Sequence, residues 1–138
     1  MSDTLYIEDA IHSHFTNDTG INGLVGGRVY PGRLPQVVIL PAIMFRQISG
    51  PREKTHGETG AFVRARFEFN CYGRTFTEVA PLARLVRRLL TNHTGTMGVA
   101  PNEYQVDEIE ISGPEDGWDD DINRHRRQLD AMLMYRED

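Results

Sequence analysis

The stretch FVRARFEFNCYGRTFTEVAPLARLVRRLL, residues 62–90, decides the fold. From Val63 to Cys71 every second residue is apolar, while mainly polar residues stand between them, which predicts a strand with one buried face. After Gly73 the apolar spacing lengthens to about 3.6 residues, which predicts a helix that ends near Leu90. A strand and a helix that each have one apolar face bury those faces against each other. The stretch therefore predicts an α+β domain.

The start of this helix has two possible caps. Thr75 and Glu78 have the spacing of a capping box, in which a hydroxyl and a carboxylate bind backbone N–H groups of the first turn. Pro81 has no N–H and would then forfeit a backbone bond to Thr77. Either Thr75 is the cap and the first turn is irregular, or Thr77 is the cap and Pro81 lies at the edge of the first turn.

Composition limits the class of protein. A chain of 138 residues predicts a single domain, residues 1–138, and its 39% hydrophobic and 25% charged residues are ordinary for a globular protein. The formal charge of −5 counts against nonspecific binding of nucleic acid. Cys71 is the only cysteine and lies on the apolar side of the strand, so we expect a buried thiol. We find no secretory signal or membrane span and expect a reducing, cytosol-like compartment.

The rest of the chain adds one more helix and further strands. We expect a helix from Ser2 or Asp3 to about Phe15, a short apolar turn near Ile21, and a loop over residues 91–104. We expect strands at residues 28–30 (a short edge strand), 42–49, 106–112 and 126–137, and an acidic turn at residues 113–125. Together these predict a mostly antiparallel sheet of four to five strands with two helices on one face and a long hairpin loop at residues 50–60.

No constellation of residues predicts catalysis. Asp119, Asp121 and Asn123 match the first ligand positions of a calcium loop, but Arg124 occupies the position that requires glycine. His12 and His14 are two residues apart on a predicted helix and point in different directions. Glu108 and Glu110 alternate with isoleucines and are predicted to face solvent. We therefore expect no enzyme activity, no cofactor and no metal.

A sheet that is covered on one side leaves its other face available to a neighbour. Mixed charges with tyrosine and methionine are typical of a protein interface rather than of a nucleic-acid groove. The residues predicted on that face are Arg64, Arg66, Glu68, Asn70, Tyr72, Met132 and Met134.

Four phrases in this order resemble the tail-completion or tail-terminator proteins of long-tailed bacteriophages and phage-like particles. They are LVGGRVYPGRLPQ, LPAIMFRQISGPREKTHG, VRARFEFNCYGRTFTEVAPLARLVRRLL and RRQLDAMLMYRE. The resemblance implies a non-enzymatic subunit of a homo-hexameric ring in the neck of the virion, assembled in the host cytoplasm. The implied ring caps the head-proximal end of the tail tube, ends tube growth and meets the head–tail connector or stopper protein, while DNA passes through it without specific binding. No membrane partner is implied.

Two further hypotheses assign residues to this ring. The polar segment at residues 50–60 has little to bury in its own subunit and is predicted to reach a neighbouring subunit or the tube. Its candidate contact residues, with three from the adjoining strand, are Arg52, Glu53, Lys54, His56, Glu58, Arg64, Arg66 and Glu68. The cluster of Asp119, Asp120 and Asp121 is predicted to line a lumen that repels DNA.

Two alternatives remain open at this stage. The chain is another neck component, such as a stopper or head–tail adaptor, or it is a small metal-dependent enzyme that uses the 119–121 aspartates with His125.

Overall fold

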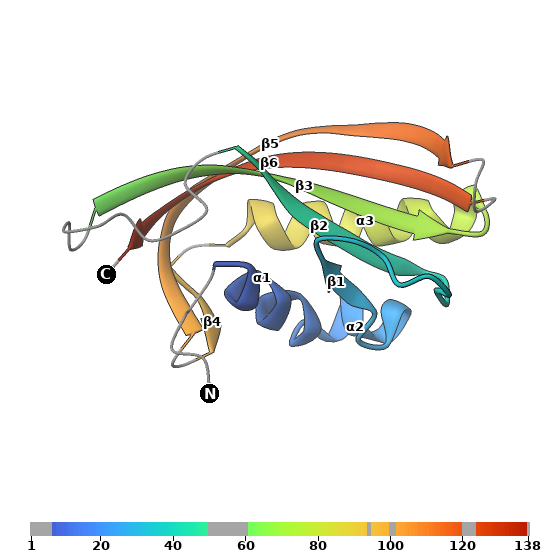
Figure 1. The fold of residues 1–138 in the computed structure, drawn as a ribbon, viewed down its shortest axis with the longest axis horizontal. Coiled ribbons are helices and arrows are strands. Elements are labelled where there is room, and N and C mark those ends of the chain that lie inside the picture. The colour runs from blue at the N-terminus through green and yellow to red at the C-terminus, as the bar shows by residue number, and fades with distance from the viewer. Residues whose placement is uncertain (1–6, 50–60, 94, 100–101, 120–123, 138) are drawn as a thin grey trace.

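The computed structural model describes residues 7–49, 61–93, 95–99, 102–119 and 124–137. These residues form three helices and six strands in one α+β arrangement (Figure 1). The elements in chain order are α1 (Ile7–Thr16), α2 (Thr19–Val25), β1 (Val29–Pro31), β2 (Ala42–Ser49), β3 (Ala61–Gly73), α3 (Phe76–Thr91), β4 (Gly95–Val99), β5 (Asn102–Asp119) and β6 (Arg124–Glu137). The prediction of four to five strands and two helices was thus too low on both counts.

The strands form one curled, mixed sheet in the order β1-β2-β3-β6-β5-β4. All neighbouring strands are antiparallel except β1 and β2, which are parallel. The expected antiparallel hairpin of β2 and β3 is confirmed, and the short strand β1 lies at an edge, as predicted. Proline at the last position of β1 suits an edge strand, because proline has no backbone N–H to donate to a neighbouring strand.

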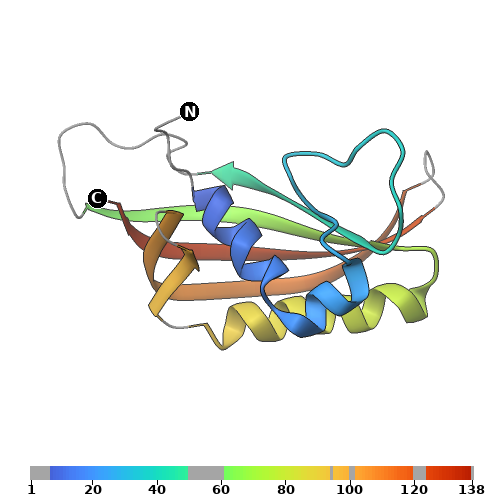
Figure 2. The ribbon, with the colours of Figure 1, turned by 90° about the horizontal axis from the view of Figure 1, so that it is seen from below.

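All three helices lie on the same face of the sheet (Figures 1 and 2). Between the layers, four fully buried rings come from α1, β2 and β3: Phe15, Phe45, Phe67 and Phe69. The Phe69 ring is stacked at 5.4 Å from Phe15 and 5.8 Å from Phe45 between centroids, within the range of favourable aromatic pairs. Residues 63–71 therefore bury their odd-numbered side chains as the alternation predicted, including the Cys71 thiol.

Thr75 is the N-cap of α3, which decides between the two predicted caps. The Glu78 N–H donates to the Thr75 hydroxyl at 3.2 Å. The Glu78 carboxylate accepts from the backbone N–H of Arg74 at 2.8 Å, one residue before the position a capping box uses. Pro81 lies inside the helix. Gly73 leaves room for this turn, since a Cβ there would lie 3.2 Å from the Val79 nitrogen.

Two loop predictions were wrong. Much of the predicted loop at residues 91–104 is β4 and the start of β5, and the predicted acidic turn at 113–125 contains the end of β5, which continues to Asp119. Glycine in β4 concealed the strand, because Gly95 and Gly98 both have positive φ and Met97 is the one buried residue among residues 95–98. Register shifts at Val106/Glu108 and Ser112/Glu115 break the alternation in β5.

The apolar turn near Ile21 is a second short helix, α2. Its N-cap is Asp18, whose carboxylate accepts from the Ile21 N–H at 3.0 Å. The helix ends at Gly26, which has φ 56° and so adopts the left-handed conformation that glycine favours. Ile21 and Val25 are buried, so the helix is held by the shared core.

Strand β3 pairs with β6 along its whole length, from Ala61 opposite Glu137 to Gly73 opposite His125. Its pairing with β2 is shorter and ends at Ser49 opposite Arg66. The first residues of β3 therefore extend beyond the end of β2 and keep only β6 as a described neighbour, while β5 pairs with the other side of β6 as far as Gln105 opposite Arg136 (Figure 1). The predicted long loop, residues 50–60, starts from this end and lies outside the described residues.

Candidate assembly interface

One face of the sheet carries none of the described helices (Figure 1). Arg64 and Arg66 are exposed on β3, and Met132 and Met134 are half-buried on β6. The orientation predicted for these four side chains is confirmed. We refer to this surface as the bare face of the sheet.

Two carboxylates lie opposite each other across the centre of the bare face. Glu68 of β3 is in register with Asp130 of β6, and like charges in such a pair repel. Each carboxylate has its own arginine: Arg46 Nε lies 3.2 Å from Glu68 Oε2, and Arg66 Nη2 lies 2.6 Å from Asp130 Oδ2. The two cations offset the repulsion and hold three strands together through their side chains.

The polar network also contains a buried amide. Asn70 is only 1% exposed and donates from Nδ2 to Glu68 Oε1 at 2.9 Å, while its Oδ1 finds no hydrogen-bond partner among the described residues. An unsatisfied buried acceptor costs about 1–3 kcal/mol.

Beside this network, a depression of about 270 Å³ lies between β3, β5 and β6. Its lining includes Arg66, Glu110, Asp130 and Met132, so the bare face is hollowed as well as charged.

The connection between β1 and β2 exposes an apolar segment that the sequence analysis did not single out. Val37 is 86% exposed and Ile39 is 67% exposed, more than any other large hydrophobic side chain described. The sequence signal was present, since residues 37–40 read VVIL between two prolines. Figure 2 shows this connection projecting beyond the β2 side of the sheet.

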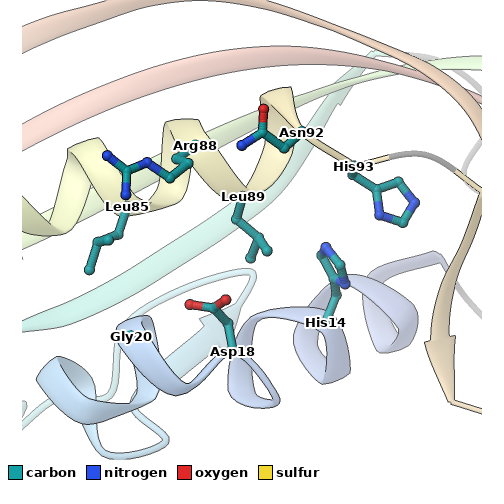
Figure 3. Close-up of a pocket in the computed structure, with 8 residues that line it drawn as sticks. All are labelled: His14, Asp18, Gly20, Leu85, Arg88, Leu89, Asn92 and His93. Atoms are coloured by element: carbon teal, nitrogen blue, oxygen red, sulfur yellow. The ribbon is translucent and has the colours of Figure 1, made fainter.

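A second hollow lies between the helices (Figure 3). It has a volume of about 490 Å³ and is lined by residues of α1, α2 and α3 and the turns that follow them: His14, Asp18, Gly20, Leu85, Arg88, Leu89, Asn92 and His93. Arg88 of α3 is part of this lining, whereas Arg84 of the same helix is not. Nothing in the sequence indicated that His14 and His93 would meet.

The two histidine rings form an edge-to-face contact with centroids 4.7 Å apart. Burial, and then the neighbouring His93, lower the pKa of His14 from 6.5 to about 4, although Asp18 acts in the opposite direction. His14 Nε2 is buried without a hydrogen-bond partner among the described residues. The His14 ring is therefore neutral at pH 7 and serves as packing between α1 and the end of α3.

The structure places only part of the predicted contact residues. Arg64, Arg66 and Glu68 share the bare face, but Glu68 is 8% exposed and already paired with Arg46, so it offers little surface to a neighbour. The other predicted contact residues, Arg52, Glu53, Lys54, His56 and Glu58, lie outside the described residues. Among the predicted lumen residues, Asp119 ends β5, and Asp120 and Asp121 are outside the described residues as well.

The described residues contain no group of three or more histidine, cysteine, aspartate or glutamate side chains that could hold a metal ion. None of the described helices is long and apolar enough to cross a membrane. The thiol of Cys71 is fully buried, which raises its pKa to about 12 and makes it unreactive as a nucleophile. Glu108 and Glu110 are exposed on β5, which confirms their predicted orientation.

Comparison with known proteins identifies a family, and it also identifies similar solved structures. The model of the family described as tail completion protein gp17 matches residues 9–136. A chain of a solved structure, "Virion of native gene transfer agent (GTA) particle", shares the fold with a TM-score of 0.69 at 13% sequence identity, over 96% of each chain. None of the curated proteins matches the chain.

Proposed function

The chain belongs to the family of tail completion protein gp17, whose members are structural proteins of the phage tail, and from this premise we propose that it forms a ring at the head-proximal end of a tail tube. In this proposal the ring ends tube growth and joins the tail to the head connector. The observation that carries the proposal is the family match over nearly the whole chain, residues 9–136.

Two features of the subunit support an assembly role. The helices cover only one face of the sheet, and the bare face carries charged pairs and half-buried methionines of the kind found in protein interfaces. Val37 and Ile39 add apolar surface that isolated subunits rarely leave exposed in contiguous patches. A ring of identical subunits buries such surfaces without a second protein.

The proposal also assigns partners. One rim of the ring meets the tail tube protein and the other meets the connector or stopper, while DNA passes through the lumen. The net charge of −5 favours a lumen that DNA does not bind, and we place Asp119, Asp120 and Asp121 there. Replacing all three with asparagine is expected to slow or reduce genome delivery while leaving tails complete; unchanged delivery would remove this assignment.

The test of the ring is a tube-assembly experiment with purified protein and tail tube protein. With the protein present, tubes are expected to stop at one length and to show a ring at one end in negative-stain electron micrographs. Tubes that grow equally long with and without the protein would refute the terminator role. Antibody labelling of whole particles on the connector side only would identify a stopper or adaptor instead.

The arm hypothesis has its own test. Deleting residues 53–58 removes the polar part of the β2–β3 connection but no described strand residue, so a folded subunit is expected that no longer joins tails to heads. Infectious particles in normal yield would contradict this assignment. Replacement of the same six residues by a flexible linker of equal length serves as the matched control for loop length.

A further inference from the structure

We infer that residues 36–40 of one subunit add as a strand to the open edge of β5 in a second copy of the chain, and that this contact, repeated head to tail, closes the ring. The inference deepens the proposed function and depends on it. It rests on a chain segment whose residues 36–39 form no backbone hydrogen bond with the described residues, and on a strand edge beside which no described strand lies. The two lie on opposite sides of the same subunit (Figure 2). The carbonyl of Leu40, the last residue of the segment, accepts from Arg74 Nη2 at 3.4 Å.

Hydrogen bonds fix the chain on both sides of the donor segment. The Gly32 N–H donates to the Phe45 carbonyl at 2.8 Å, and Arg28 Nε donates to the Pro41 carbonyl at 3.0 Å. Between these anchors, the backbone groups of residues 33–39 form no hydrogen bond with the described residues. Free amides in a fixed segment are what a strand needs in order to add to a sheet edge.

The same segment has the side-chain pattern of a strand. Val37 and Ile39 are exposed, while Val38 and Leu40 are half-buried, so exposure alternates with a period of two. Three of these four residues are β-branched, the class most enriched in strands. The side-chain pattern of the segment therefore suits strand pairing, and its backbone, which bends at residues 36, 37 and 40, would straighten in the contact. Its two most exposed side chains, 86% and 67%, offer apolar surface that a partner can cover.

The acceptor is the edge of β5 that faces away from β6. Strand β4 covers this edge only as far as Val106. At the far side, Arg87 Nη1 reaches over from α3 and donates to the Gly113 carbonyl at 3.2 Å. Between these two contacts, at residues 108–112, no described strand pairs with β5 on the side away from β6. We call this side of residues 108–112 the open β5 edge.

The two surfaces match in polarity and charge. Ile109 and Ile111 of the open β5 edge are half-buried and pack against the core, so Val37 and Ile39 placed beside them would extend the apolar side of the sheet. On the other side, Glu108 and Glu110 are exposed, and the exposed Arg33 lies three residues before the donor segment, which itself has no charge. Opposite charges across the contact fix its orientation more than they strengthen it.

The topology favours a second copy over a tube subunit as the partner. The donor follows β1, at one end of the strand order, and the acceptor lies at the other end (Figure 2). Donor and acceptor of one chain cannot meet, whereas donor and acceptor of successive copies meet head to tail. A contact of this kind repeats with a fixed rotation, and it closes into a ring when that rotation divides a full turn and carries no rise along the axis.

Cysteine cross-linking tests the contact directly. If residues 37 and 39 lie beside 109 and 111, Val38 faces Glu110 whether the added strand is parallel or antiparallel. The double variant Val38→Cys/Glu110→Cys, assembled on tail tubes and oxidised, is expected to give a ladder of disulfide-linked oligomers that ends at the ring. A mixture of the two single variants is expected to give linked dimers only, because each subunit then has one introduced cysteine. The native Cys71 does not interfere, because it is fully buried.

Two control variants separate the possible outcomes. Val38→Cys/Arg64→Cys places the second thiol on the bare face and is expected to stay monomeric on the gel. Val37→Asp/Ile39→Asp is expected to fold, since both side chains are exposed, but to form less than a tenth of the wild-type rings, whereas Leu24→Asp, at an exposed leucine of α2, assembles normally.

Each result decides between the hypotheses. If rings form on tubes but Val38→Cys/Glu110→Cys gives no more cross-linked oligomer than Val38→Cys/Arg64→Cys, the strand contact is wrong and the proposed function still stands. Rings of the Val37→Asp/Ile39→Asp variant that no longer bind tubes would assign the segment to the tube protein, which also overturns the inference. Neither rings nor cross-links in the presence of tubes would refute the inference and the terminator role together.

Discussion

Acidification should destabilise the subunit through His14. The pKa of this histidine is lowered from 6.5 to about 4 in the folded chain, so below pH 6.5 the unfolded chain binds a proton that the folded chain rejects. The contribution of neutral His14 to stability is therefore complete above pH 6.5 and is lost as the pH falls toward 4. A pKa shift of one unit corresponds to about 1.36 kcal/mol, so the shift from 6.5 to about 4 sets an upper limit of about 3.4 kcal/mol on the stability that is lost.

The expected effect is smaller than this limit. The ring is only half-buried at the groove between α1 and α3, and solvent screens part of its interaction with His93. We therefore expect wild-type protein to lose about 1–2 kcal/mol between pH 7.5 and 4.5 through this group alone. Urea unfolding at several pH values measures the loss as a change in the free energy of unfolding.

The variant His14→Gln isolates the contribution. Other groups also destabilise the fold at low pH; the N–H of Arg74, for example, lowers the pKa of Glu78, whose stabilisation is lost as the pH falls through its folded pKa. These groups are common to both proteins and cancel in the difference. His12→Gln, on the same helix, is the matched control. If wild type and His14→Gln lose stability in parallel from pH 7.5 to 4.5, the assignment is wrong.

Three further predictions concern the core and the bare face. Phe69→Ala removes a fully buried ring that is stacked on Phe15 and Phe45. It is expected to lower the free energy of unfolding by about 3–5 kcal/mol in urea titrations, and a loss below about 1 kcal/mol would contradict the aromatic core. Arg66→Ala is expected to cost no more than about 1 kcal/mol in the same assay, because its ion pair with Asp130 is half-exposed, and a cost like that of Phe69→Ala would refute this ranking. The thiol of Cys71, with a pKa near 12, is expected to react with a thiol reagent only in denaturant; rapid labelling of native protein would show that β3 opens.

The elements with regular apolar spacing could be predicted from the sequence. Strand β3 and helix α3 follow the change of period at Gly73, and the inward side of β6 follows the alternation from Leu129 to Tyr135. One-sided covering of the sheet followed from these patterns and from the order of elements. In these segments the spacing of apolar residues matches the period of the strand or helix, so the side that is buried can be read from the sequence.

The missed elements lack this local signal. Strand β4 contains two glycines with positive φ, and β5 changes register twice, so neither shows a constant period. Their strand conformation depends on pairing with each other and with β6, which is a tertiary effect. The groove at His14 and His93 depends on the packing of α1 against the end of α3 and has no sequence pattern. The segment at residues 37–40 did have one, but it lies in a proline-bounded loop, where apolar residues are not expected to matter.

The pairing of β3 with β6 has a mechanical consequence. The connection at residues 50–60 joins β3 at Ala61, the first residue of the β3–β6 ladder, so a pull on Ala61 along the strand axis loads the ladder in shear. Loaded in this direction, the ladder from Ala61 to Gly73 shares the force among all its rungs at once instead of opening them one after another. In the proposed ring, a subunit that bears tension through this connection would distribute the force over the long β3–β6 ladder.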